Sequence, residues 1–95
     1  MKFMLLHVGF EKPTPEVMAA WKNWFESAAG VTVEQGGLMN GVEISADGNT
    51  ELGWDANTLT GFSIIDVDDR AAAEKLANDN PYITAIRVYE IRAHG

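Results

Sequence analysis

The 95-residue sequence contains no cysteine and only two histidines, His7 and His94. The absence of cysteine excludes disulfide bonds, a thiolate nucleophile and a cysteine-ligated metal site. Neither histidine has an HxxxH partner or a carboxylate at ligand spacing, so we expect no metal site. The sequence also lacks a serine nucleophile elbow, a phosphate-binding glycine loop and a dinucleotide fingerprint. We therefore expect no cofactor.

Positive charge is missing from the middle of the chain. No lysine or arginine occurs from residue 23 to residue 69, where every charged side chain is acidic, and the formal net charge of the whole chain is −7. A nucleic-acid-binding protein needs a basic surface, and an anionic membrane surface repels an acidic one. The composition therefore predicts no nucleic-acid partner and no membrane partner. We interpret the acidic middle as a solvated hairpin.

The sequence has no long hydrophobic run. The apolar stretch nearest the N-terminus, residues 3–6, is far too short to span a bilayer. A single lysine precedes it and His7 follows it, which does not match the pattern of a signal peptide. We therefore expect a cytoplasmic protein.

Segments with strand and helix periodicity follow one another without spare sequence. Strands are predicted at residues 1–9, 38–44, 61–67 and 83–91, and helices at residues 14–29 and 69–78. This βαββαβ order predicts a single domain, residues 1–95, of the α+β class. We expect a ferredoxin-like fold, in which a four-stranded antiparallel sheet of order 4-1-3-2 carries both helices on one face.

The two predicted helices have recognisable start signals. Thr14 can cap the first helix and Pro15 suits its first position, whereas either Asp68 or Asp69 can cap the second. At 100° per residue, one arc of the first helix collects the apolar residues Val17, Ala20, Trp21, Trp24, Phe25 and Ala28. Packing against the sheet explains this arc without a ligand.

Turn-forming residues punctuate the middle of the chain. The Gly36-Gly37 pair is interpreted as a break before the second strand, and residues 47–49 read Asp-Gly-Asn, a turn signal. Residues 47–59 are longer than a tight hairpin loop and contain Trp54. A tryptophan in such a loop suits a dimer contact as well as a substrate lid.

The two faces of the first strand differ in composition. Met4, Leu6 and Val8 form a purely aliphatic set, which we assign to the helix-covered face. His7 is then predicted on the open face. The open face would also carry Phe3 and Leu5.

The last strand supplies two further candidates for the open face. Arg87 and Tyr89 alternate with apolar neighbours and lie on the strand predicted beside the first one. His7, Arg87 and Tyr89 are therefore predicted to meet there, with Ser63 of the third strand as a weaker member. An imidazole, a cation and a phenol can bind and polarise a small anion or carbonyl, with His7 as the catalytic acid or base. The alternative is that these side chains only line a wet face or a dimer interface.

An apolar open face also predicts self-association. Phe3, Leu5, Ile65 and Ile91 would leave an exposed apolar patch on a very small domain. We therefore expect a homodimer formed through the open sheet face.

Several short motifs resemble the YCII-related domain family, including its DGPF branch. They are residues 1–6 (MKFMLL), 21–25 (WKNWF), 36–38 (GGL), 61–65 (GFSII) and 80–82 (NPY), which together span nearly the whole chain. The resemblance implies a ferredoxin-like subunit that pairs into a dimeric α/β barrel with a cleft at the interface. Members of the family are thought to be enzymes of unassigned activity.

Two departures from the family pattern mean that no catalytic residue can be carried over. Trp21 occupies the position nearest to the helix histidine of the branch with a suggested His-Asp pair. The Asp-Gly-Pro-Phe motif is also absent, and residues 53–57 read Gly-Trp-Asp-Ala-Asn in its place.

Three functions remain open at the level of sequence. The first is a YCII-like protein with a small-molecule ligand at the open face or dimer interface. The second is a non-catalytic dimeric accessory or regulatory module, and the third is a monooxygenase of the dimeric α/β barrel type. An enclosed cavity around His7 would favour a ligand, whereas a filled interior would favour the module.

Overall fold

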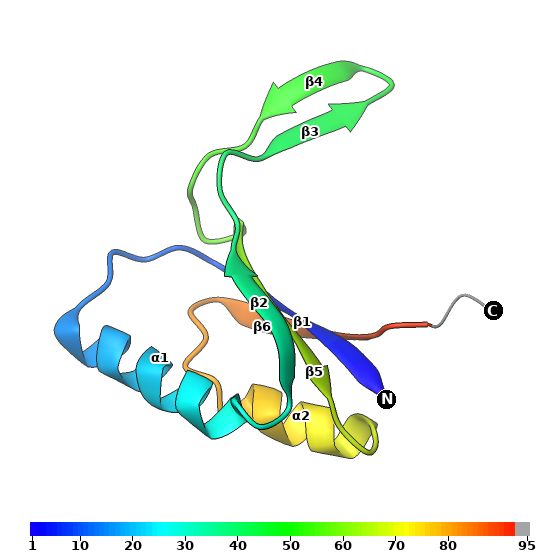
Figure 1. The fold of residues 1–95 in the computed structure, drawn as a ribbon. Coiled ribbons are helices and arrows are strands. Elements are labelled where there is room, and N and C mark those ends of the chain that lie inside the picture. Colours follow the sequence, from blue (N-terminus) through cyan, green and yellow to red (C-terminus); the bar gives the residue numbers. More distant parts are fainter. Residues whose placement is uncertain (93–95) are drawn as a thin grey trace.

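The computed structural model describes residues 1–92 (Figure 1). Its elements are β1 (Lys2–Val8), α1 (Pro15–Ala28), β2 (Thr32–Gly37), β3 (Val42–Ser45), β4 (Gly48–Glu51), β5 (Leu59–Asp66), α2 (Arg70–Asn78) and β6 (Ala85–Glu90). Four strands form one antiparallel sheet in the order β2-β5-β1-β6. Both helices lie on the same side of this sheet (Figure 1). The predicted α+β, ferredoxin-like fold and its strand order are confirmed.

Local hydrogen bonds set the starts of both helices. The Thr14 hydroxyl accepts a hydrogen bond from the Val17 amide at 3.2 Å, and an Asp69 carboxylate oxygen accepts one from the Ala72 amide at 2.8 Å. Asp69 rather than Asp68 is therefore the cap of α2. The helices are joined by the Trp24 indole, which donates to the Leu76 carbonyl at 2.9 Å.

The core lies between the sheet and the two helices. Its buried residues are Phe3, Leu5, Trp24, Ala28, Ile65, Ala73 and Ala77. The prediction that Phe3, Leu5 and Ile65 face outward is wrong, because the odd-numbered residues of β1 point toward the helices. The open face instead carries Met4 and Leu6, which are only half-buried.

The second strand of the sheet was predicted at residues 38–44, and this position is wrong. β2 is Thr32–Gly37, so the Gly36-Gly37 pair ends this strand instead of preceding it. Most of β2 is exposed and polar, so it lacks the apolar alternation that identifies a strand. Gly36 is needed there because a Cβ atom on it would lie 2.9 Å from Cε1 of Phe62 on the neighbouring strand.

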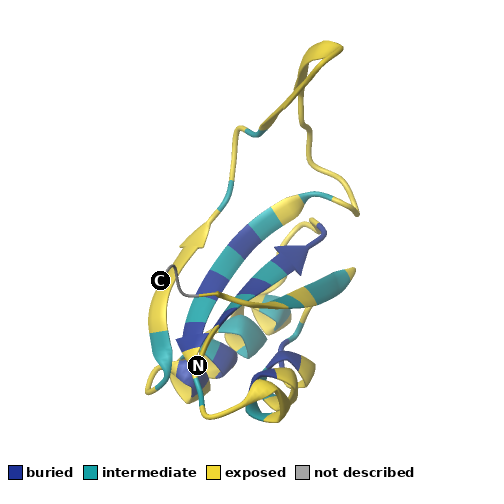
Figure 2. Cartoon of the chain, turned by 90° about the vertical axis from the view of Figure 1, so that its right-hand side faces the viewer, coloured by how far each residue is buried: buried dark blue, intermediate teal, exposed yellow. Residues whose placement is uncertain are grey.

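The residues after β2 form a separate hairpin, which we call the arm (residues 42–51). Strands β3 and β4 pair only with each other, and all of their residues are exposed (Figure 2). The predicted turn near Asp47 is confirmed, because residues 46–47 join the two strands. The arm extends the molecule: the Cα radius of gyration is 14.5 Å, against about 12 Å for a compact chain of this length.

In the part of the chain that the structure describes, neither helix has the length and apolar character needed to cross a bilayer.

Candidate functional site

His7 lies on the helix-covered face of the sheet, and its predicted position on the open face is wrong. Its side chain is only 6% exposed, and its ring centroid is 5.0 Å from that of Trp21 and 6.1 Å from that of Trp24. Because Phe3 and Leu5 occupy the inner face, strand alternation carries His7 inward with them. The two indoles meet the imidazole edge-on from α1.

Arg87 and Tyr89 lie on the opposite side of the sheet from His7. Arg87 is paired with Leu6 and Tyr89 with Met4, and both side chains are exposed on the open face. The sheet therefore separates them from the imidazole, and the predicted cluster of His7, Arg87 and Tyr89 does not form.

Ser63 is the one predicted site residue that shares the face of His7. It pairs with Leu5 of β1 and with Gln35 of β2, and its side chain is fully buried. Its hydroxyl oxygen has no hydrogen-bond partner among the described residues. Ser63 and Gln35 thus add polar groups to the surface that carries His7.

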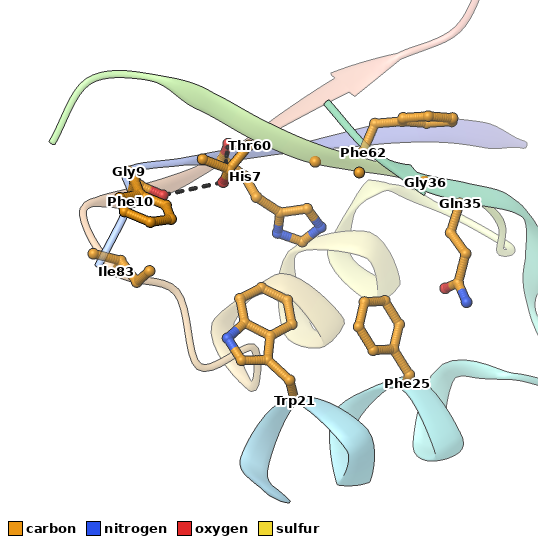
Figure 3. A pocket seen from close by; sticks show the side chains of 12 residues that line it. His7, Gly9, Phe10, Trp21, Phe25, Gln35, Gly36, Thr60, Phe62 and Ile83 are labelled. Atoms are coloured by element: carbon orange, nitrogen blue, oxygen red, sulfur yellow. Dashed lines mark hydrogen bonds between the residues drawn. The ribbon is translucent and has the colours of Figure 1, made fainter. Parts of the chain in front are cut away.

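A cavity of about 500 Å³ opens between the sheet and α1 beside His7 (Figure 3). Figure 3 shows His7 pointing down from β1 toward Trp21 and Phe25, which rise from α1 to meet it. The cavity is lined by His7, Gly9, Phe10, Trp21, Phe25, Gln35, Gly36, Gly37, Thr60, Gly61, Phe62 and Ile83. Four aromatic residues and two polar ones therefore line the cavity with His7, and among the described residues no other acidic or basic side chain does so.

The imidazole of His7 is buried without compensation. Neither Nδ1 nor Nε2 has a hydrogen-bond partner among the described residues. Burial lowers the pKa of His7 to about 4, because desolvation disfavours the charged ring. At neutral pH the ring is therefore uncharged, with one nitrogen free to donate and the other free to accept a hydrogen bond.

Glycines in the strands next to His7 provide the space for the cavity. Gly37 ends β2 and pairs with Gly61, which lies opposite His7 on β5, so no side chain projects toward the cavity from either position. A Cβ atom on Gly61 would approach His7 Cδ2 to 3.3 Å. The Thr60 hydroxyl fixes the neighbouring end of β1 by donating to the Gly9 carbonyl at 3.0 Å.

Sequence reasoning did not identify Phe10, Gln35 or the glycines as site residues. The Gly36-Gly37 pair was the available signal, since glycine inside a strand marks a place where another group approaches closely. The polar residues in front of this pair have no apolar pattern, so the sequence alone favours a turn there.

The arrangement suits binding of an organic molecule better than binding of a metal. Residues 1–92 contain no group of three histidine, cysteine, aspartate or glutamate side chains that could hold a metal ion. His94, the other histidine considered above, lies outside the described residues. An apolar cavity with a few convergent polar groups is typical of small-molecule sites.

Comparisons with known proteins agree with this architecture. One similar solved structure is 5-chloro-2-hydroxyhydroquinone dehydrochlorinase (TftG) from Burkholderia phenoliruptrix AC1100, in complex with 2,5-dihydroxybenzoquinone. The match covers 100% of this chain and 96% of that one, with a TM-score of 0.61 and 17% sequence identity, and at this identity it shows the fold alone. A search of curated proteins found no match. The model of the YCII-related domain matches residues 1–93. The chain therefore belongs to the YCII-related domain family.

Proposed function

We propose that this protein binds an uncharged, planar aromatic molecule with hydroxyl or keto oxygens in the cavity beside His7, and that His7 acts on it as an acid or base. The observation that carries the proposal is the neutral imidazole with two unpartnered nitrogens in an aromatic-lined cavity. A buried polar group without a partner costs stability, about 1–3 kcal/mol, unless a ligand or water satisfies it. A ring oxygen of the ligand would do so.

The lining favours an aromatic ring. Phe10, Trp21 and Phe25 offer faces and edges at which a flat ligand can stack. The volume of about 500 Å³ falls within the range of small-molecule sites. The dehydrochlorinase of similar fold was solved with 2,5-dihydroxybenzoquinone, which is also a planar ring with hydroxyl and keto oxygens but is an anion at neutral pH.

The charges of the protein disfavour an anionic ligand. Within residues 1–92, no lysine or arginine lines the cavity, and the chain as a whole carries a net charge of −7. A buried carboxylate without a cationic partner is strongly unfavourable. The ligand should therefore be recognised by its ring and its neutral oxygens.

The role of His7 follows from its protonation state. A neutral imidazole can accept the hydrogen of a ring hydroxyl at one nitrogen while it donates from the other to a keto oxygen. Proton movement between these positions is the kind of step that a histidine catalyses. The non-catalytic module is disfavoured because it predicted a filled interior around His7.

Calorimetric titration with hydroquinone tests the proposal. We expect saturable binding by calorimetry, and a shift of the indole N–H resonance of Trp21 when the same titration is followed by NMR. The affinity should weaken at least about tenfold in His7→Phe, which keeps a flat ring but removes both nitrogens. Benzoate should bind more weakly than hydroquinone because its carboxylate has no cation to pair with.

The control is Lys22→Ala, which changes an exposed residue of α1 and should leave the binding unchanged. Failure of hydroquinone and catechol to bind would contradict the proposal and favour the accessory module. Binding that His7→Phe leaves intact, in a variant with the circular dichroism of the parent, would also contradict it.

A further inference from the structure

Phe10 lies at the rim of the His7 cavity. It lines the cavity, yet its side chain is 46% exposed. Figure 3 shows its ring beside Ile83 at one end of the cavity, whereas Gln35 lies at the other end. The segment that carries Phe10, residues 9–14, forms neither helix nor strand. The position of the Phe10 ring is therefore fixed by contacts from elsewhere in the chain.

These contacts come from residues 53–58, between β4 and β5, which we call the 53–58 loop. The Phe10 amide donates a hydrogen bond to the Asp55 carbonyl at 3.0 Å, and the Gly9 amide donates one to the Thr58 carbonyl at 2.7 Å. The ring of Phe10 packs against that of Trp54, with 5.0 Å between the ring centroids and 49° between the ring planes. The same loop thus holds both the backbone and the ring of Phe10.

The 53–58 loop is itself well anchored. The Thr58 hydroxyl accepts a hydrogen bond from the Asp55 amide at 2.8 Å, and an Asp55 carboxylate oxygen accepts one from the Asn57 amide at 2.7 Å. The Thr84 hydroxyl, just before β6, donates to the Ala56 carbonyl. Bonds from side chains to nearby backbone groups stabilise a turn without help from a sheet. The loop can therefore act as a fixed support for the ring that packs on it.

Trp54 can affect the cavity through Phe10. Trp54 is not among the described residues that line the cavity, and its side chain is 51% exposed. An aromatic pair is stabilised beyond its buried area by an amount that corresponds to roughly two- to tenfold in an equilibrium constant. The contact with Trp54 is therefore strong enough to decide which position of the Phe10 ring is populated.

We infer that Trp54 is a positioning residue for the His7 cavity, which holds the Phe10 ring at the rim and thereby limits both access to the imidazole and the size of the ligand. The part that concerns ligand size rests on the proposed function, whereas the part that concerns access does not. A ring that stays inside the cavity stacks against a fixed Phe10 and gains from the contact. A ligand with a bulky substituent that extends past the rim has to displace the Phe10 ring.

Chemical modification of the imidazole tests access without any ligand. Diethyl pyrocarbonate reacts with an uncharged imidazole, which is the form of His7 at neutral pH. We expect His7 to react roughly two- to tenfold faster in Trp54→Ala than in the parent chain, because Phe10 is released from the rim. Trp54→Phe keeps an aromatic ring beside Phe10 and should restore most of the parent rate. Peptide mapping by mass spectrometry assigns the modification to His7 rather than to His94.

A double-mutant cycle shows whether Trp54 acts through Phe10. Phe10→Ala should accelerate the modification of His7 at least as much as Trp54→Ala does, and Trp54→Ala should have no further effect in the Phe10→Ala background. A parent-like rate in Trp54→Ala, or an effect of equal size in that background, would overturn the inference.

The matched control is Leu52→Ala. Leu52 is 52% exposed at the base of the arm and, like Trp54, lines a recess of about 620 Å³ outside the His7 cavity. This variant should leave the rate of His7 modification unchanged. Circular dichroism checks that each variant is folded, and Trp54→Leu, which stays apolar but lacks a ring, repeats the measurement if Trp54→Ala is not.

Calorimetry with two hydroquinones tests the part that concerns ligand size. Hydroquinone should bind roughly two- to tenfold more weakly to Trp54→Ala, whereas tert-butylhydroquinone should lose less affinity or gain some. The ratio of the two affinities should return to the parent value in Trp54→Phe. A loss of stability alone would lower both affinities alike, so a ratio that Trp54→Ala leaves unchanged would overturn this part. If neither ligand binds while His7 still reacts faster in Trp54→Ala, the proposed function fails and the role of Trp54 in access stands.

Discussion

At the scale of single residues, His7 combines a polar ring with an apolar environment. Its inward position costs stability because neither nitrogen is partnered, and its neutrality at physiological pH follows from the same burial. A side chain placed only for packing would be better replaced by an aliphatic one. At His7 we therefore expect stability and function to favour different side chains.

The titration of His7 predicts a dependence of stability on pH. Its pKa is about 4 in the folded chain and near 6.5 when unfolded, so the unfolded state binds the proton more readily. The contribution of the uncharged His7 ring to the free energy of unfolding is fully present above pH 6.5 and is lost as the pH falls toward 4. Between pH 7 and pH 4 we expect a loss of about 2 kcal/mol in the free energy of unfolding, less than the full linkage value because the ring borders a cavity open to solvent.

The measurement is urea denaturation at fixed protein concentration for the parent and His7→Phe. The variant removes this titration but keeps the acidic residues, so the difference between the two curves isolates His7. The free energy of the parent should fall faster on acidification. Parallel curves would show that His7 is not the group responsible.

At the scale of elements, the helices begin where side-chain caps satisfy free amides, and α1 buries the arc predicted for it. Trp24 and Ala28 are buried, and Glu16, Lys22 and Glu26 remain exposed. The Trp24 bond to Leu76 then joins α1 to α2 beneath the sheet. Phe25, which lines the His7 cavity from α1, packs against this core.

The two adjacent aspartates at the start of α2 provide a matched test of capping. Asp69→Ala removes the acceptor of the Ala72 amide and should lower the free energy of unfolding by about 1 kcal/mol. Asp68→Ala removes the same charge one residue earlier and should change it by less than about 0.5 kcal/mol. Chemical denaturation measures both, and equal losses would mean that charge rather than the cap stabilises the helix.

At the scale of the whole molecule, the domain has two surfaces that its own chain leaves uncovered, the arm and the open face. Packing with a second copy would bury both. The His7 cavity lies on the other side of the sheet, so dimerisation and ligand binding are expected to use separate surfaces.

Proteolysis offers a readout of the arm in the intact protein. A glutamate-specific protease should cleave after Glu43 and Glu51 when the protein is dilute, because both residues are exposed on a hairpin with no cover. If the predicted homodimer covers the arm, cleavage there should slow several-fold as the protein concentration rises. Mass spectrometry identifies the cleavage sites.

Trypsin is the internal comparison for this experiment, since no lysine or arginine occurs from residue 23 to residue 69. It should leave the arm intact at any concentration. Cleavage after Glu43 at a rate independent of protein concentration would contradict a role for the arm in dimerisation.

Local sequence determined the elements that depend on near neighbours. Caps, helix periodicity and the turn near Asp47 act within a few residues, so the order of elements and the inner stripe of α1 could be predicted. The missed strand β2 marks the limit of this approach. Its polar residues lie at an edge of the sheet, and only the partner strand β5 shows them to be a strand.

Tertiary structure alone decided which face of β1 points inward. Met4 and Leu6 on one face and Phe3 and Leu5 on the other are both apolar, so alternation permits either orientation. The larger ring of Phe3 fills the space below the sheet, and Trp21 and Trp24 of α1 receive the odd-numbered side chains. That choice puts His7 and Ser63 on the helix-covered face, where His7 lines the cavity, and leaves Arg87 and Tyr89 on the open face. A change of face by one residue reverses every side chain of a strand.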